Sequence, residues 1–132
     1  MATVALKEKS ISLLSSTSSV DMSDAAAGTK TDLYTVPTGK VCIVTHIVVR
    51  SPSATLAGGT DYDFGAGTTP TAWNDTAIDL SNMTATTDAQ LENAGNVFTV
   101  CAAGTTFGVI ANTGSTGAAT ATIDVFGYLY DA

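Results

Sequence analysis

The sequence predicts an all-β fold: an antiparallel β-sandwich, with a jelly roll as the expected arrangement. Three observations lead to this prediction. Short apolar runs alternate with glycine-containing turns along most of the chain, a spacing typical of sandwiches and barrels. Of the 132 residues, 45% are hydrophobic and only 13% are charged, which favours one packed core over disorder. No segment indicates a long helix, and about eight strands can be counted, the number in a jelly roll.

The N-terminal segment differs in composition from the rest. Residues 1–30 are rich in Ser and Ala, and we expect a partly extended N-terminal arm there, with a short strand over residues 11–14. A short helix over residues 20–27, capped by Asp21 or Ser23, is the alternative for part of this arm. Residues 31–132 are expected to form the sandwich domain.

The expected strands of that domain are bounded by turn-forming residues. The most apolar one covers residues 41–50, and the last covers residues 120–130. Others are expected over residues 33–36, 61–64, 77–80, 97–102 and 106–111, with a long polar connection over residues 82–96 that contains a small element. Pro37 and Gly39 suit the end of a strand, because Pro fixes φ and Gly can adopt a positive φ.

The segment 41–50 is apolar on both of its faces. With strict alternation, Val41 and Ile47 lie on one face and Val44 and His46 on the other. A strand of this kind is covered on both sides, by a second sheet or by another subunit. The predicted core consists of Val41, Ile43, Ile47, Val49, Phe107, Val109, Ile123, Val125 and Leu129.

The last strand carries three aromatic side chains on the face opposite its core residues. Phe126, Tyr128 and Tyr130 share this face, and contiguous apolar patches usually mark interaction sites, where aromatics are enriched. We therefore expect these three residues, with His46, to form the contact of a homo-oligomer. Two alternatives remain: the arm or a loop of the same chain covers the rings, or a bulge at Gly127 turns some of them inward.

The distribution of charge excludes several classes of partner. The net charge is −7, and no basic residue follows Arg50. Nucleic-acid affinity depends largely on Lys and Arg, so we expect no nucleic-acid partner, and the same absence disfavours anionic membranes and phosphorylated substrates. We find no export signal and no apolar run long enough to span a membrane. Lys7, Lys9 and Lys30 of the arm are the residues expected to contact an acidic partner surface.

No residue pattern indicates an enzyme or a cofactor. The chain has one histidine, His46, in the middle of an apolar strand, and no nucleophile motif accompanies it. A sugar site could use Asp61 and Asp63 beside Tyr62, or Asp75 and Asp79 after Trp73, and a calcium site could use Asp61 and Asp63. Solvated acids at strand or loop ends are the simpler interpretation.

Two cysteines lie inside apolar runs. For Cys42 and Cys101, buried free thiols are the simpler interpretation, and a disulfide is the alternative. Two cysteines alone cannot form a zinc site.

Two stretches resemble small β-sandwich domains of tailed-bacteriophage structural proteins: LYTVPTGKVCIVTHIVV at residues 33–49 and CAAGTTFGVIANTGSTGAATATIDVFGYLYD at residues 101–131. The resemblance implies a jelly-roll virion protein, and within this group we favour a capsid decoration (cement) protein over a head fibre. It further implies a homotrimer made in the host cytoplasm and bound to the major capsid protein on the outer capsid surface. The alternatives are a tail or fibre module that binds a receptor or carbohydrate, and a cellular β-sandwich adaptor. No catalytic residue comes with the resemblance.

Overall fold

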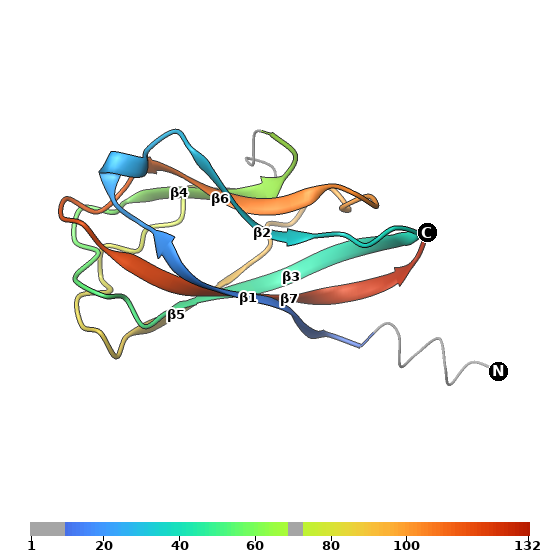
Figure 1. Ribbon diagram of the computed structural model, residues 1–132, viewed down its shortest axis with the longest axis horizontal. Coiled ribbons are helices and arrows are strands. Elements are labelled where there is room, and N and C mark those ends of the chain that lie inside the picture. Colours follow the sequence, from blue (N-terminus) through green and yellow to red (C-terminus); the bar gives the residue numbers. More distant parts are fainter. Residues whose placement is uncertain (1–9, 69–72) are drawn as a thin grey trace.

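The computed structural model describes residues 10–68 and 73–132. Two antiparallel sheets pack against each other in two layers (Figure 1), which confirms the predicted all-β sandwich. The described residues form seven strands and one short 3₁₀ turn, η1. These elements are β1 (Ser12–Asp21), η1 (Asp24–Ala26), β2 (Lys30–Thr35), β3 (Lys40–Arg50), β4 (Asp61–Ala66), β5 (Ala89–Asn93), β6 (Thr106–Thr113) and β7 (Thr120–Asp131).

Consecutive strands alternate between the two sheets. The four-stranded sheet has the order β1-β7-β3-β5 and the three-stranded sheet the order β2-β6-β4, so each connection crosses from one layer to the other. An isolated bridge joins Tyr62 of β4 to Ile78. The two longest strands, β3 and β7, pair along their whole length at the centre of the four-stranded sheet.

The core between the layers is built from the inward side chains of both sheets. Six of the nine predicted core residues are confirmed as buried, and these are Ile47, Val49, Phe107, Val109, Ile123 and Val125. Leu129 is partly buried against them. The rings of Phe64, Trp73 and Phe107 pack together with centroids 5.7–6.3 Å apart, a range typical of favourable aromatic pairs.

Strand β3 contains a β-bulge that the alternation pattern did not predict. Val44 pairs with Gly127 and His46 with Phe126, so Thr45 has no partner in this ladder. One extra residue reverses the inward and outward faces of the strand that follows it. The prediction that Val41 and Ile43 belong to the core is therefore wrong: they are half-buried on the outer side, while Cys42 and Val44 point inward and are buried.

The N-terminal segment also differs from the prediction. Ser12–Asp21 forms a full edge strand paired with β7, and Met22 is completely buried. Residues 12–30 are thus part of the sandwich and not of an arm, because this edge of the core needs their apolar side chains. Residues 1–9 of the expected arm lie outside the described residues. The alternative helix is reduced to the single turn η1.

Two other expected strands are shorter than predicted. Within residues 77–80 the structure has only the bridge at Ile78, and within residues 97–102 only a bridge between Cys101 and Cys42. The small element expected inside residues 82–96 is present as β5. Gly39 has the positive φ that its turn required, +78°.

Candidate interaction surface

The outer face of the four-stranded sheet carries a continuous row of apolar and aromatic side chains. Residues that pair directly in an antiparallel ladder share a face, so the register identifies the members of this surface. Val41 lies opposite Tyr130, Ile43 opposite Tyr128, and Val48 opposite Leu91. We call this set the outer apolar face, and it consists of Leu13, Val41, Ile43, His46, Val48, Leu91, Phe126, Tyr128 and Tyr130.

At the centre of the outer apolar face, His46 stacks on Phe126. The ring centroids are 4.5 Å apart and the planes are inclined by only 7°. The imidazole Nδ1 lies 3.0 Å from the hydroxyl of Thr45, and that hydroxyl also donates to the carbonyl oxygen of Phe126 at 3.3 Å. The bulge thus turns His46 outward, and the hydroxyl of the bulged Thr45 contacts both the imidazole and the backbone of Phe126.

The exposure of this face distinguishes it from the core. Phe126, Tyr128 and Tyr130 are half-buried, whereas Leu13 and Leu91 are each 54% exposed. The prediction that the three aromatics share one outward face with His46 agrees with this arrangement. The sequence analysis did not assign Leu13 and Leu91 to this face, because their place on it depends on strand pairings with Phe126 and Val48 that the sequence does not show.

Ion pairs lie at both ends of the outer apolar face. Lys40 Nζ is 2.6 Å from Asp131 Oδ1 at one end, and Arg50 Nε is 2.8 Å from Asp124 Oδ2 at the other. Ser16 also donates to Asp124 at 2.6 Å. Burial raises the pKa of Asp124, but the hydrogen bonds from Arg50 and Ser16 outweigh burial, so the pKa is lowered overall. The face therefore combines an apolar centre with locally balanced charge.

The outer face of the three-stranded sheet is polar by comparison. Asn112 Nδ2 donates to Asp61 at 3.1 Å and to Asp63 at 2.8 Å, and Asn74 Nδ2 donates to the other oxygen of Asp63 at 3.1 Å. Both carboxylates considered for calcium thus accept hydrogen bonds from amides. Within residues 10–68 and 73–132, no group of three or more potential metal ligands is found.

The two aromatic residues considered for stacking on sugars are not on the surface. Trp73 is 3% exposed and donates from Nε1 to the carbonyl oxygen of Val44 at 2.8 Å. Tyr62 is 1% exposed and donates to the carbonyl oxygen of Met22 at 2.6 Å, and burial raises its pKa to about 12. Neither ring can offer a face to a ligand in this structure.

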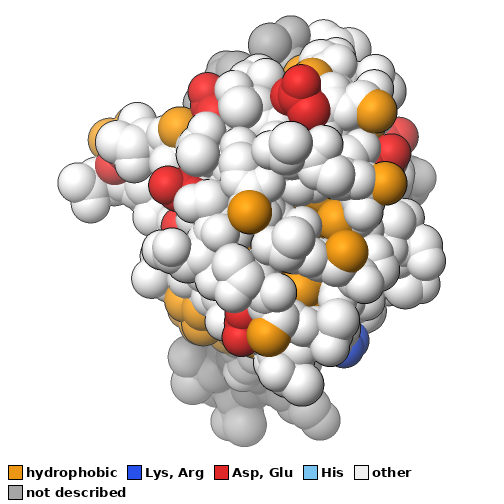
Figure 2. All heavy atoms as spheres, turned by 90° about the vertical axis from the view of Figure 1, so that its left-hand side faces the viewer, with side chains coloured by type: hydrophobic (Ala, Val, Ile, Leu, Met, Phe, Trp, Pro, Cys, Tyr) orange, Lys and Arg blue, Asp and Glu red, His pale blue; other side chains and the backbone are white. Residues whose placement is uncertain are grey.

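One end of the sandwich gives a further comparison. Figure 2 shows the end at the left of Figure 1, where apolar side chains are mostly scattered among polar ones and acidic side chains outnumber basic ones. Among the loops at this end are the one that follows β3 and the one between β6 and β7. This end therefore lacks the extended apolar row found on the four-stranded sheet.

The side chain of Lys30 is largely buried and bonds to groups of its own chain. Its ammonium group donates to the carbonyl oxygen of Thr106 at 2.8 Å and lies 3.3 Å from Asp32, and its side chain is 16% exposed. This geometry does not support the expected role of Lys30 in contacting a capsid. Lys7 and Lys9 lie outside the described residues.

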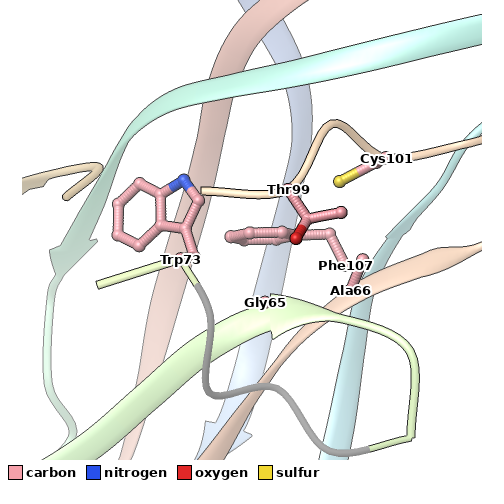
Figure 3. Close-up of a pocket in the computed structure, with 6 residues that line it drawn as sticks. All are labelled: Gly65, Ala66, Trp73, Thr99, Cys101 and Phe107. Atoms are coloured by element: carbon pink, nitrogen blue, oxygen red, sulfur yellow. The ribbon is translucent and has the colours of Figure 1, made fainter. Parts of the chain in front are cut away.

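A small cavity near the core is lined by Gly65, Ala66, Trp73, Thr99, Cys101 and Phe107 (Figure 3). Its volume is about 90 Å³, far below the several hundred Å³ of a typical ligand pocket.

Both cysteines are free and buried. No helix among the described residues is long and apolar enough to cross a membrane.

Comparison with known proteins gives no relative: no family model, no curated protein and no solved structure matches this chain. The phage resemblance thus depends on residues 33–49 and 101–131 alone.

Proposed function

We propose that this protein is a virion structural protein that binds the outside of a phage head and stabilises it as a decoration protein. The observation that carries the proposal is the outer apolar face, a row of apolar and aromatic side chains across the four-stranded sheet. Surfaces of this kind mark sites of protein association. Cement proteins stabilise an assembled shell through the binding energy of their contacts and catalyse no reaction. This agrees with a chain whose candidate functional site is an exposed surface.

The strand order supports a jelly roll. The segment at Ile78 can be counted as a shortened fifth strand between β4 and β5, which gives eight strands numbered in chain order. The two sheets then have the orders 1-8-3-6 and 2-7-4-5. Consecutive strands lie in different layers, except for the fourth and fifth, which pair with each other. That is the order of two interleaved Greek keys. Jelly rolls occur in viral capsid proteins as well as in lectins and cupins, so the order agrees with the proposal without specifying it.

Self-association is the second part of the proposal. A chain with a net charge of −7 repels a second copy over most of its surface. The outer apolar face adds little to this repulsion, because Lys40 and Arg50 are both paired with acids at its ends. From the spacing of strands and residues, the face measures roughly 600 Å², close to the ~800 Å² that each partner buries in a standard interface.

We propose a homotrimer that uses Phe126, Tyr128, Tyr130 and His46 at or near the subunit contact. The preference for three copies over two comes only from the phage resemblance. The major capsid protein is the proposed partner of the assembled trimer, with Lys7 and Lys9 as the basic residues remaining for that contact.

Purified protein added to undecorated heads tests the capsid role. Bound protein should co-sediment with the heads and raise the temperature at which they release DNA. An absence of binding by protein that is shown to be trimeric would refute decoration and leave self-association standing. Binding to host surface glycans in place of heads would favour the tail or fibre alternative.

Light scattering with a matched pair of variants tests the subunit contact. Tyr128→Asp places a charge on the outer apolar face, whereas Ile110→Asp places the same charge on the outer side of β6 in the other sheet. We expect only Tyr128→Asp to convert the oligomer to monomer. A wild-type protein that is already monomeric at micromolar concentration would refute the interface.

A further inference from the structure

The two cysteines of the chain are direct neighbours across a β-bridge. Cys42 lies in β3 and Cys101 in the connection between β5 and β6, and they form an isolated antiparallel bridge. The amide of Cys42 donates to the carbonyl of Cys101 at 2.9 Å, and the amide of Cys101 donates back at 2.8 Å. The chain contains no other cysteine, so each thiol has one possible partner within the molecule.

The bridge brings the two residues into the range required for a disulfide. A pair that exchanges both backbone hydrogen bonds has its Cα atoms about 5.5 Å apart, and disulfides span Cα separations of about 4.4–6.8 Å. Cys42 is 0% and Cys101 4% exposed, so both side chains lie on the core side of the bridge. In a hydrogen-bonded pair the two Cβ atoms lie about 5.5 Å apart, so the bridge must close by roughly 1 Å to reach the Cβ separation of about 3.5–4.5 Å found in disulfides.

We propose that Cys42 and Cys101 form an oxidative cross-linking site, at which hydrogen peroxide converts two buried thiols into an intramolecular disulfide. The inference does not depend on the proposed capsid role. In the structure both cysteines are free thiols, and the proposal concerns their reaction with an oxidant.

Cys101 is the thiol that reacts first. It lines the cavity of about 90 Å³, and Figure 3 shows its sulfur at the edge of that space. A cavity of this size holds a molecule as small as peroxide, since a water molecule occupies about 30 Å³ in the liquid. Burial raises the pKa of both thiols, that of Cys42 to about 12, where the nearby Cys101 also contributes. Cys42 is 0% exposed and is not among the residues that line the cavity, so it is the more protected thiol.

The two steps balance as follows. The Cys101 thiolate attacks one peroxide oxygen, the O–O bond breaks, and hydroxide leaves, which gives a sulfenic acid. The Cys42 sulfur then attacks the sulfenic sulfur and gives up its proton, the S–O bond breaks, and water leaves. Two thiols and one peroxide become one disulfide and two waters, so the protein loses two electrons and the peroxide gains them.

The cross-link would add a covalent connection to a segment that is otherwise joined to the sandwich by contacts such as the hydrogen bond from the amide of Ala94 to the carbonyl of Thr45 and the packing of Phe98 against the core. Val97 is 84% and Val100 43% exposed, and the segment between β5 and Cys101 contains no regular strand. The neighbours of Cys42 in β3, Val41 and Ile43, belong to the outer apolar face. A disulfide on the inner side of β3 would therefore stiffen the strand that carries part of this face.

Intact-mass measurement after peroxide treatment of the folded protein tests the proposal. We expect the wild-type chain to become lighter by two hydrogen atoms, to return to its original mass with a reductant, and to melt at least about 5 °C higher when oxidised. In Cys42→Ser, Cys101 has no partner and should gain oxygen and react with a sulfenic-acid trap. In Cys101→Ser, Cys42 should stay reduced for much longer.

Several outcomes would overturn the proposal. Wild-type protein that gains oxygen atoms without losing two hydrogens would show that the thiols cannot meet. Covalent dimers on a non-reducing gel would show that they meet in different molecules. Thiols that stay reduced in the folded chain, under conditions that oxidise the urea-unfolded chain, would show that the cavity does not admit peroxide.

Discussion

Replacing Gly127 by Ala should destabilise the protein, although alanine is normally better than glycine in a strand. A Cβ atom built on Gly127 meets the carbonyl group of Ile43 and Cα of Val44, all backbone atoms of β3 no more than 2.9 Å away. Backbone in the middle of a sheet cannot turn aside as a flexible side chain can. The strands must therefore separate at the point where Val44 pairs with Gly127.

The magnitude follows from two opposing terms. Alanine in place of glycine stabilises a strand by about 0.5–1 kcal/mol, whereas overpacking of a tight site costs about 1–3 kcal/mol. We expect a net loss of about 1–2 kcal/mol in the free energy of unfolding, measured by urea denaturation. The melting temperature should fall by several degrees.

Gly117 provides the matched control for this measurement. It lies between β6 and β7, its φ is not positive, and a Cβ built there meets nothing within 4 Å. Gly117→Ala should leave stability unchanged or raise it by up to about 1 kcal/mol. If Gly127→Ala proves as stable as wild type or more so, the close approach of β3 and β7 is not a constraint, and the reasoning is refuted.

Three further substitutions test the core, a buried hydrogen bond and an ion pair. Ile47→Ala should cost about 2–5 kcal/mol and the outward-facing Val41→Ala clearly less; similar urea midpoints for both would show that the faces of β3 are not as described. Trp73→Phe removes the indole donor from a buried carbonyl and should cost about 1–3 kcal/mol, which thermal melting would detect, whereas an unchanged melting temperature would mean that water replaces the donor. Burial acts to raise the pKa of Asp124, but hydrogen bonds, Arg50's foremost among them, hold it below the ordinary 3.8, so the stabilisation is present above that pH and is lost as pH falls through the lowered value. Asp124→Asn should thus be less stable than wild type at pH 7 and approach it at pH 3; an equal difference at both pH values would contradict this.

The fold class and the face pattern of the last strand could be read from the sequence because β7 keeps strict alternation. Ile123 and Val125 are fully buried, and Phe126 and Tyr128 lie on the outer side, as the period of two requires. The first strand could not be read in the same way. Its Ser-rich sequence covers an edge with two irregularities in register, so the apolar residues that fix it to the core, Val20 among them, do not recur with a regular period.

The cavity and the cysteine bridge were outside the reach of sequence patterns for a different reason. Both depend on contacts between segments far apart in the chain, such as Cys42 with Cys101 and Trp73 with the carbonyl of Val44. Composition shows that these side chains prefer burial, but it does not show which neighbours they meet. The sequence therefore left the disulfide as an alternative, and the bridge turns it into a specific chemical prediction.

The bulge at Thr45 and the glycine at position 127 together form the outer apolar face. Without the extra residue, strict alternation from Cys42 and Val44 would direct His46 into the core and Ile47 onto the surface, and the stack of His46 on Phe126 could not form. Beside the bulge, β3 and β7 approach so closely that a Cβ at position 127 would meet the backbone of Ile43 and Val44. Since these two residues affect both the stability of the central strand pair and the side chains on the outer apolar face, a substitution at Gly127 should weaken the proposed self-association as well as folding. A Gly127→Ala protein that is destabilised yet associates like wild type would separate the two roles and remove the bulge from the account of the interface.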